Sequence, residues 1–560
     1  MVHLALTTDA DGCVITPLAN DGAQSAPPTL VPDTALAAVV ARLEAQHPRW
    51  VWDDTTTWYP KLLAAGVRVE RCVDLRLSHT ILRHSELTAS SDLARAAPNP
   101  WDAPLAEVPV RPTGVALFDF AAEEPSAARI DPLREFRMQR RAAASAPDPN
   151  RIGLLLAAES AGALVAAEMQ FGGLPWRADL HNELLTSLLG PRPHDGDRPA
   201  LLEATLLRVR RALNAPDLNP DSPPDLLKAL ARAGLMATST RSWELKKLDH
   251  PAIAPLLEYK KLSRLLAANG WHWLETNVAD GRFRPDYVVG GVVTGRWASK
   301  GGGGALQLPK QIRGAVVADP GWKLVVADAS QLEPRILAAI SGDARMAEAG
   351  REKDMYAGIL ASGAVATRAQ AKVAMLGAMY GATTGESGRL MPKLTRAYPK
   401  AIGLVEDAAR RGERGEIVTT RLGRSSPQPG AAWRQAQSEA YGETATDADR
   451  RRARGEARSW GRFTRNFVVQ GTAAEWALCW MASLRGLLTE IGGSVWLTDA
   501  PHLVFFLHDE LVVHCPAPLT DAVVDAVQDA AGRAAVLLFG HTPVQFPLSI
   551  AVVDNYAQAK

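Results

Sequence analysis

The sequence predicts an α/β protein made of several domain-sized units. Its 560 residues allow three or four such units, at roughly 100 to 200 residues per domain. Residues 1–172 alternate short apolar runs with proline-rich breaks, as a mixed α/β domain does. Residues 201–268 instead repeat apolar side chains at three- and four-residue spacing, which predicts a largely helical arm. Strand-like apolar runs return in the C-terminal half, so a second α/β part is expected there.

Composition and charge exclude several classes of protein. Hydrophobic residues make up 47% of the chain and the formal net charge is +1, so any binding to nucleic acid must use local basic patches. The four cysteines are far apart and form no Cys-x-x-Cys pair, which argues against a cysteine zinc site or a disulfide framework. The N-terminus lacks a signal-peptide pattern, and no apolar run approaches the roughly 18 residues that cross a bilayer. We therefore expect a cytoplasmic protein.

Two segments in the middle of the chain stand out by composition. Gly301 to Gly304 form a glycine run that cannot be a helix interior and that marks a loop before an apolar strand. The segment from Arg410 to Arg465 is rich in arginine. Its simplest interpretation is a solvated helical surface, and the alternative is a strip that faces phosphates.

An acidic residue ends the first apolar strand of the C-terminal half. The run from Leu324 to Ala327 delivers Asp328, and a helix-like segment with Leu332 and Ile336 follows. An acid at the end of a buried strand is well placed to hold a metal ion. Taken alone, such an aspartate is more often the N-cap of a helix.

A second acidic site lies between two apolar runs near the C-terminus. Residues 502–507 and 511–515 are β-prone and are separated by little more than His508, Asp509 and Glu510. This pattern predicts a hairpin with acids at its tip. Aspartate is common in turns for local hydrogen-bonding reasons, so a plain hairpin is the alternative.

Between these sites, one helix carries a stripe of functional side chains. Arg368, Lys372, Leu376 and Tyr380 follow one another at four-residue spacing, so they lie on one slowly turning face. Two cations near the start of a helix can face a polyphosphate, where the helix dipole also favours negative charge. Together with two acids from separate strands, the stripe supplies what nucleotidyl transfer needs, namely ligands for two divalent ions and cations for a triphosphate.

These three patterns resemble motifs of the family A DNA polymerases, the class of bacterial DNA polymerase I. Motif A is resembled by Asp328 to Arg335, motif B by Arg368 to Gly381, and motif C by His508 to Glu510, in the family's order and spacing. Two further segments are similar to the family's duplex-binding parts: Thr294-Gly295-Arg296 with Ser299 and Gln307-Leu-Pro309, and the series Arg462, Asn466, Gln470-Gly-Thr-Ala-Ala474.

The resemblance implies a role for each matched residue. Asp328 and Asp509 would ligate two Mg²⁺ ions, with Mn²⁺ able to substitute, and Glu510 would support that catalytic site. Glu333 would act as the steric gate that favours deoxynucleotides. The remaining nucleotide-binding residues would be Arg368, Lys372, Leu376, Tyr380, Gln331 and Tyr356. Primer and template would be bound by Arg296, Gln307, Arg462, Asn466, Gln470 and His508, whose donors can check the similar minor-groove acceptors of every base pair.

Three positions depart from the family's pattern. Ala329 replaces an aromatic residue of motif A, Leu376 replaces the aromatic residue of motif B, and the Asp-x-His before motif B reads Asp354-Met-Tyr356. The predicted metal ligands are intact. The changes therefore bear on sugar discrimination, nucleotide affinity and fidelity and leave the reaction class unchanged.

Residues 1–172 resemble the family's 3′-to-5′ proofreading exonuclease in the shape of its sequence blocks. Gly66 and Asp74 match, but Trp58 stands where a metal-binding acid is expected, and Leu156 and Ser160 replace a tyrosine and an aspartate. No Asp-x-Glu strand lies near the start. A two-metal site without its carboxylates cannot hold its ions, so we expect a folded domain without proofreading. Asp53, Asp54 and Asp119 are the nearby acids that could overturn this expectation.

The resemblance thus predicts an RNase H-like α/β domain followed by a right-hand polymerase. The polymerase domain is expected at 173–560, with a thumb at about 201–290, a palm at about 291–342 and 466–560, and fingers at about 343–465. We expect a monomer, associated with the nucleoid, that binds primer-template DNA and deoxynucleoside triphosphates and does not bind membranes. Three alternatives stay open: a bifunctional 3′-to-5′ exonuclease and polymerase, a non-catalytic DNA-binding scaffold, and a nuclease whose polymerase half only positions DNA.

Overall fold

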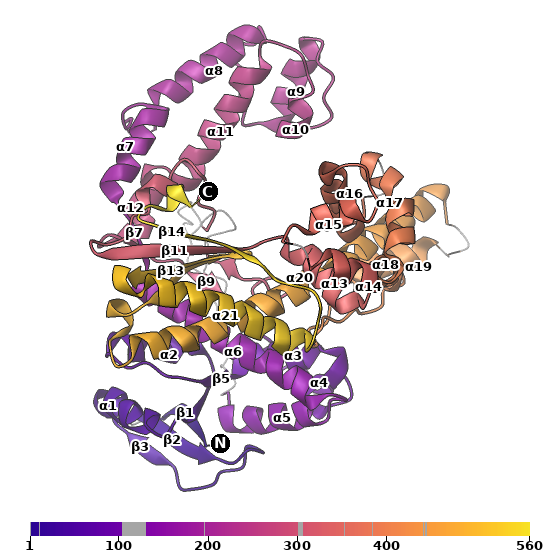
Figure 1. Ribbon diagram of the computed structural model, residues 1–560. Helices are drawn as coiled ribbons and strands as arrows, with labels where there is room; N and C mark the ends of the chain where they lie inside the picture. The colour runs from indigo at the N-terminus through magenta and orange to yellow at the C-terminus, as the bar shows by residue number, and fades with distance from the viewer. Residues whose placement is uncertain are drawn as a thin grey trace, which may run out of the picture. The chain divides into compact units, whose positions relative to one another are not determined.

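The computed structural model describes residues 2–9, 12–103, 130–194, 196–300, 306–351, 353–382, 385–440, 442 and 445–559 (Figure 1). The chain divides into two compact units. The first comprises Met1–Gly172, Asp286–Lys300 and Val325–Ala551, and the second comprises Gly173–Pro285, Gly301–Leu324 and Val552–Lys560. Asp119 and the glycine run at 301–304, both singled out in the sequence, lie outside the described residues.

A mixed β-sheet organises the N-terminal part of the first unit. Its strands are ordered β3-β2-β1-β4-β5, with β1, β2 and β3 antiparallel and with β4 and β5 parallel to β1. The mixed α/β architecture that the sequence predicts for residues 1–172 is therefore present. The strands are β1 (His3–Asp9), β2 (Gly12–Leu18), β3 (Thr29–Val31), β4 (Arg49–Trp52) and β5 (Cys72–Asp74).

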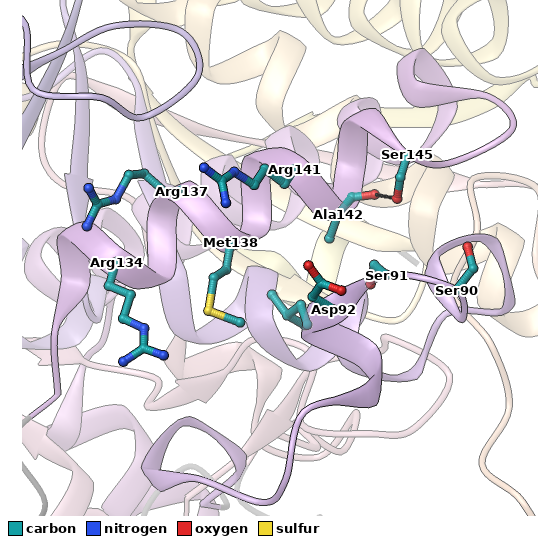
Figure 2. A pocket seen from close by; sticks show the side chains of 10 residues that line it. Ser90, Ser91, Asp92, Arg134, Arg137, Met138, Arg141, Ala142 and Ser145 are labelled. Carbon is teal, nitrogen blue, oxygen red and sulfur yellow. Dashed lines mark hydrogen bonds between the residues drawn. The ribbon is translucent and has the colours of Figure 1, made fainter.

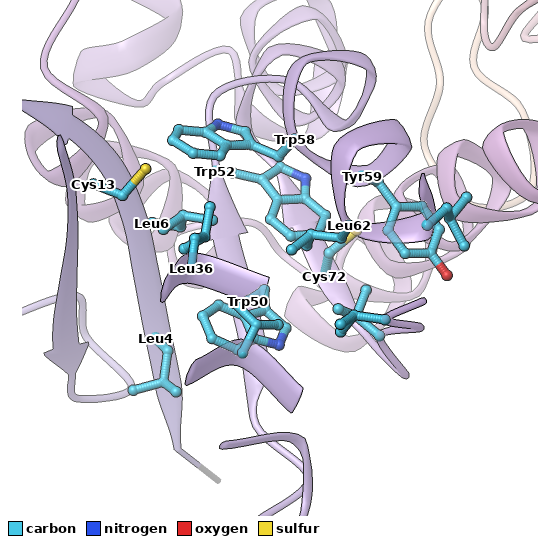
Figure 3. Close-up of a cluster of buried hydrophobic side chains, with 14 of the residues drawn as sticks. Leu4, Leu6, Cys13, Leu36, Trp50, Trp52, Trp58, Tyr59, Leu62 and Cys72 are labelled. Carbon is cyan, nitrogen blue, oxygen red and sulfur yellow. The ribbon is translucent and has the colours of Figure 1, made fainter. Parts of the chain in front are cut away.

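Aromatic side chains fill the core on one side of this sheet (Figure 3). Trp50 and Trp52 of β4 are fully buried, and Trp58 and Tyr59 pack beside them. The register pairs Trp52 with Asp74, which ends β5 and begins the next helix. The helices of this part are α1 (Asp33–Glu44), α2 (Thr55–Ala64), α3 (Leu75–His84), α4 (Asp92–Arg95), α5 (Pro132–Ala144) and α6 (Pro149–Gly172).

Helix α6 corrects one expectation from the sequence. Its 24 residues are long and apolar enough to cross a membrane by length and composition, although no apolar run of such length was expected. However, 67% of its most apolar window is buried inside the protein. The apolar run was missed because Glu159 and Glu168 interrupt it, and both of these carboxylates are themselves buried. Its contacts identify α6 as a core helix.

Glu168 joins α6 to two other parts of the first unit. It accepts hydrogen bonds from Tyr59 Oη at 2.6 Å, Arg68 Nε at 2.9 Å and Arg485 Nη2 at 2.7 Å. Arg485 lies on α20 (Asp447–Gly492), a continuous helix of 46 residues. Each of these groups is largely or fully buried, so the charges of Glu168 and Arg485 compensate one another. The N-terminal part is thereby fixed to α20.

A four-stranded sheet carries the acidic residues of the C-terminal half. Its order is β12-β13-β11-β14, and the hairpin predicted around Asp509 is present as β12 and β13, with Leu507 paired to Glu510. Residues 324–327 of β11 are buried, as the apolar run predicted. The strands are β11 (Trp322–Ala329), β12 (His502–Leu507), β13 (Glu510–Pro516) and β14 (Leu548–Val553), beside the short pair β9 (Tyr287–Val288) and β10 (Ala298–Ser299).

The remaining long elements of the first unit, as far as the structure describes it, are helices. Helix α20 packs against α18 and α21, and α16 begins at an N-cap where the Thr367 side chain accepts from the Gln370 amide. The helices are α13 (Leu332–Ser341), α14 (Ala344–Ala349), α15 (Met355–Ala361), α16 (Arg368–Tyr380), α17 (Gly385–Ala397), α18 (Pro399–Glu413), α19 (Ala431–Ala440) and α21 (Thr520–Phe539).

The second unit contains the helices predicted for residues 201–268 and a small sheet. Trp176, Trp273 and Phe283 pack together with centroids 5.1 to 5.8 Å apart. The sheet order is β6-β8-β7. The elements are β6 (Leu174–Pro175), α7 (Ala178–Leu189), α8 (Ala200–Ala212), α9 (Pro223–Arg232), α10 (Ser242–Leu245), α11 (Ile253–Asn269), α12 (Trp271–Asn277), β7 (Val278–Ala279) and β8 (Arg282–Phe283).

Candidate active site

The two predicted metal-binding aspartates lie on neighbouring strands. Asp328 is the penultimate residue of β11, and Asp509 lies in the turn between β12 and β13. The amide of Ala329 donates a hydrogen bond to the carbonyl oxygen of Asp509 at 2.8 Å, so the two backbones touch. Both aspartates are partly exposed, whereas Glu510 at the start of β13 is buried. The fold thus brings together residues that are 181 positions apart in the sequence (509 minus 328).

This donor set fits one kind of metal ion. In the described part of the chain there is no group of three or more His, Cys, Asp or Glu side chains that could hold a metal. Mg²⁺ is commonly bound by only one or two carboxylates, with waters and substrate phosphates completing its octahedral shell. Two aspartates at a partly exposed sheet end therefore suit Mg²⁺ better than an ion that needs an all-protein cage.

The backbone near the two aspartates adopts unusual conformations. His508, directly before Asp509, has φ of 60°, and Gln331, three residues after Asp328, has φ of 56°. Non-glycine residues seldom occupy this left-handed region, and they cluster at functional sites. Burial, followed by the positive charge of Arg296, lowers the pKa of the His508 imidazole. A neutral His508 can both donate and accept one hydrogen bond.

Glu333 is the centre of a hydrogen-bonded group. Arg296 Nη2 donates to its Oε1 at 2.5 Å, and the Tyr380 hydroxyl donates to its Oε2 at 2.8 Å. Gln470 Nε2 then donates to the Tyr380 hydroxyl at 3.3 Å. Partial burial and the bond to Glu333 raise the pKa of Tyr380. Four residues that the sequence singled out in separate motifs are therefore in contact.

The predicted stripe lies on the exposed face of α16. Arg368, Lys372, Leu376 and Tyr380 are all exposed. The opposite face packs into the protein through Ala371, Ala374, Met375, Ala378 and Met379. Helical periodicity alone explains this division, because residues four apart share a face.

Arg368 already has an anionic partner. Its Nε donates to Asp354 Oδ2 at 2.5 Å, and its guanidinium lies 5.6 Å from the centroid of the Tyr356 ring. Asp354 also accepts from Gln331 Nε2 at 2.8 Å, while Gln331 Oε1 accepts from the Met355 amide at 2.8 Å. In the sequence, Asp354 is the acid that keeps the Asp-x-His pattern from which Tyr356 departs, and the resemblance gives it no role of its own. Its position two residues before Tyr356 is the signal that could have identified it as part of the site.

Helix α20 brings the predicted DNA-contacting residues beside the end of α16. A Cβ added at Gly381 would lie 2.8 Å from Arg462 Cγ, and Gly381 has φ of 73°, so a glycine is required there. Arg465 Nη1 donates to the Ala378 carbonyl at 2.8 Å, a contact that no local sequence pattern indicates. Asn466 is partly exposed between Arg462 and Gln470 on the same helix. Gln307 lies in the second unit, where its Oε1 accepts from Arg264 Nη2 at 2.8 Å.

The acids of the N-terminal sheet have structural partners. Asp74 is buried and accepts from the amides of Thr55 at 2.8 Å and Leu77 at 2.9 Å. Burial and the nearby charge of Asp54 raise its pKa to about 6. Trp58 donates to Asp53 Oδ1 at 2.7 Å. Ser160 Oγ accepts from the Asp74 amide at 3.1 Å and donates to the Leu156 carbonyl.

Comparisons with known proteins agree with this arrangement. Residues 208–558 match the family described as DNA polymerase family A. A thermostable DNA polymerase I of Thermus thermophilus is 27% identical over 353 residues, which is 57% of this chain and 38% of the relative. The DNA polymerase of Escherichia phage T5 is 34% identical over 115 residues, 20% of this chain and 14% of the relative. The chain thus spans less than two fifths of the length of these relatives.

A solved structure shares the fold along the whole chain. It is the polymerase domain of Pol1 from M. smegmatis, in complex with a DNA primer-template and a dNTP. The TM-score is 0.65 at 18% sequence identity, and the match covers 100% of this chain and 95% of that one. At this identity the likeness shows a common fold and leaves the roles of single residues to other evidence.

Proposed function

Because the chain belongs to family A of the DNA polymerases, we propose that it is a template-directed enzyme that adds deoxynucleotides to a primer 3′-hydroxyl. The observation that carries the proposal is the contact between Ala329 N and Asp509 O, which joins the ends of two acid-bearing strands. Besides ligands for metal ions, nucleotidyl transfer needs a binding surface for a triphosphate, and the cationic face of α16 supplies it. Primer-template DNA and deoxynucleoside triphosphates would be the partners of the chain, which would act as a cytoplasmic, nucleoid-associated monomer.

Asp328 and Asp509 are the residues that would hold the metal ions. Their carboxylates are hard oxygen ligands, and Mg²⁺ would take its remaining ligands from water and from the substrate phosphates. Two bound ions would activate the primer 3′-hydroxyl and stabilise the departing pyrophosphate. Glu510 would support the site from its buried position, and Mn²⁺ would substitute for Mg²⁺.

The exposed face of α16 would bind the incoming nucleotide. Arg368 and Lys372 would hold the triphosphate, and Leu376 and Tyr380 would border the base and sugar. A phosphate would compete with Asp354 for the Nε edge of the Arg368 guanidinium, whose Nη groups supply further donors. Tyr356 would lie beneath Arg368, and Gln331 would hold Asp354 in place.

Glu333 would exclude ribonucleotides. Its carboxylate is held between Arg296 and Tyr380, so it cannot swing away from a 2′-hydroxyl without breaking two hydrogen bonds. The duplex would be contacted by Arg296, Gln307, Arg462, Asn466, Gln470 and His508, through minor-groove acceptors that differ little between base pairs. Such contacts test the shape of a base pair and carry little sequence preference.

We assign residues 1–172 to an exonuclease-like domain without proofreading. The strand register supports this, because it pairs Trp52 with Asp74 on β5, while on the other side the β1–β4 pairs run as far as Ala5 and Val51, so that Leu6 is the next residue of β1. Leu6 and Trp52 are both fully buried. The central strand therefore offers an apolar side chain where a second carboxylate would be needed. The polymerase domain would be 173–560, with thumb 201–290, palm 291–342 and 466–560, and fingers 343–465.

Primer extension tests the proposal. The purified chain is incubated with a labelled primer-template, Mg²⁺ and four deoxynucleotides, beside Asp509→Ala and a matched control, Asp525→Ala, which removes an exposed aspartate of α21. Asp509→Ala should lower the extension rate on the order of 1,000-fold, since metal stabilisation of the transition state contributes several kcal/mol. The control should extend normally.

The same experiment separates the alternatives. A primer that stays intact in a parallel reaction without nucleotides indicates that proofreading is absent, whereas metal-dependent shortening would show an active exonuclease. Extension by neither the wild type nor the control, at any Mg²⁺ or Mn²⁺ concentration, would instead favour a DNA-binding scaffold.

A further inference from the structure

Arginine side chains gather on the exposed face of α5. Arg134, Arg137, Arg140 and Arg141 are all exposed, whereas Phe136 on the other face is buried. Arg140 Nε donates to the Asn20 carbonyl at 2.7 Å. The other three make no ion pair and no side-chain hydrogen bond with any residue that the structure describes. In a chain whose net charge is only +1, this is a local concentration of uncompensated positive charge.

These three arginines line a pocket with α4 and the segment before it (Figure 2). The pocket also has hydroxyl groups and an apolar part, and Asp92 is the acidic residue in its lining. The lining consists of Ser90, Ser91, Asp92, Leu93, Arg134, Arg137, Met138, Arg141, Ala142 and Ser145. Ser91 and Ser145 already use their hydroxyls locally, toward the Ala94 amide and the Ala142 carbonyl. The arginines therefore remain as the charged donors available to a ligand.

The chemistry of the lining indicates the class of ligand. Guanidinium groups bind phosphates through paired hydrogen bonds. From Arg134 to Arg141 the helix advances about 10 Å, at 1.5 Å per residue, which is longer than one phosphate group. Proteins that hold single-stranded nucleic acid combine a basic track for the backbone with aromatic side chains on which the bases stack. No aromatic side chain stands in this lining, and the apolar surface open to a base is that of the partly exposed Met138, because Leu93 is only 2% exposed.

We propose that the α4–α5 pocket binds single-stranded DNA, with phosphates at Arg134, Arg137 and Arg141 and a base against Met138. The choice of DNA as the ligand rests on the proposed polymerase function. The pocket is separate from the residues of the polymerase site and from Asp74, which is buried at the start of α3. A domain without catalytic acids would in this way retain a role in holding the strand.

The test is the salt dependence of DNA binding by the full chain. A labelled oligothymidylate is titrated with wild type, with Arg137→Gln/Arg141→Gln, and with the control Arg42→Gln/Lys61→Gln, which removes two exposed cations from α1 and α2. Each lost phosphate contact should reduce the slope of log K against log salt by about 0.7, so the pocket variant should lose about 1.4. Its affinity at 0.1 M salt should fall on the order of tenfold. The control should match wild type.

A third variant should change the affinity for the strand in the opposite direction. Asp92→Asn removes the one carboxylate of the pocket and should tighten binding, because it removes repulsion from phosphates. The proposal is overturned if Arg137→Gln/Arg141→Gln has the slope and affinity of the control. It is also overturned if a mononucleotide displaces the strand at equal phosphate concentration, or if a blunt duplex shows the same loss on substitution.

Primer extension on a short template distinguishes failure of this proposal from failure of the polymerase assignment. The pocket variant should extend such a template at the wild-type rate. Normal extension with unchanged strand binding refutes the pocket alone. Absence of extension by wild type refutes the polymerase function, and with it the reason for choosing DNA as the ligand.

Discussion

Substitution of Glu168 tests how firmly the N-terminal part of the first unit is fixed to α20. The carboxylate is buried and is shared by Arg68, Arg485 and Tyr59. Glu168→Gln keeps the shape but leaves the buried Arg485 guanidinium without its counter-ion. Breaking one partner of a buried ion pair costs about 3–5 kcal/mol. We therefore expect the free energy of unfolding of this part to fall by about 3–5 kcal/mol.

Denaturant unfolding, followed by the fluorescence of the buried tryptophans Trp50 and Trp52, measures this loss. Glu406→Gln is the matched control, because it breaks an exposed pair with Arg410 that should contribute less than about 1 kcal/mol. The double variant Glu168→Met/Arg485→Met removes both charges and should be more stable than Glu168→Gln. A Glu168→Gln variant as stable as the control would refute the reasoning.

The pH dependence of the same variant has a defined sign. The positive charges of Arg485 and Arg68, acting against the effect of burial, hold the pKa of Glu168 well below its ordinary value. A lowered pKa in the folded state gives stability that is present above the unfolded pKa of about 4.3 and is lost as the pH falls through the folded value. The difference in stability between wild type and Glu168→Gln should therefore shrink as the pH falls below about 4.

Three further predictions concern the candidate active site and its surroundings. Asp354→Asn frees Arg368 for the triphosphate, while the asparagine still caps α15. The KM for deoxynucleotides should fall about two- to fivefold, which is the size of effect expected for one exposed ion pair. A higher KM in steady-state kinetics would contradict this. Glu333→Ala should raise ribonucleotide incorporation relative to deoxynucleotide incorporation by at least about tenfold, measured as the ratio of kcat/KM values. The reason is that the loss of one steric or polar contact changes discrimination by about 1–3 kcal/mol. An unchanged ratio would exclude Glu333 as the gate. Burial raises the pKa of Glu475 to about 7, so the protonated form is favoured in the folded state and the fold loses stability as the pH rises from about 4.3 through 7. In thermal unfolding, Glu475→Gln should therefore gain stability relative to wild type between pH 5 and pH 8. A gain that is equal at both pH values would exclude this ionisation as its source.

Local patterns in the sequence predicted the parts of the site that depend on local geometry. The four-residue spacing of the series from Arg368 to Tyr380 defines a helix face without any knowledge of the rest of the fold. Likewise, two apolar runs around Asp509 define a hairpin and its tip. These elements appear in the structure at the expected places.

The partners of those residues could not be predicted in the same way. Arg368 and Asp354 are 14 residues apart, and Arg485 and Glu168 are 317 apart. Such pairs form only when separate elements pack, and nothing in the local pattern around Glu168 distinguishes a buried carboxylate from a solvated one. The length of the apolar run in α6 could not be predicted for the same reason. In the sequence, Glu159 and Glu168 are indistinguishable from surface charges, and only the packed structure places Arg424 and Arg485 beside them.

Helix α20 works mechanically as a single rod. Gln470 reaches Tyr380, while Arg485, 15 residues further along, is held by Glu168. At 1.5 Å per residue the two points are about 22 Å apart, so a rotation of about 3° about Arg485 displaces Gln470 by about 1 Å. A shift of that size is enough to misalign a reacting group. By holding Arg485, the N-terminal part therefore limits how far α20 can rotate and how far Gln470 can move within the candidate active site. This role requires rigid packing and no catalytic activity of the N-terminal part itself.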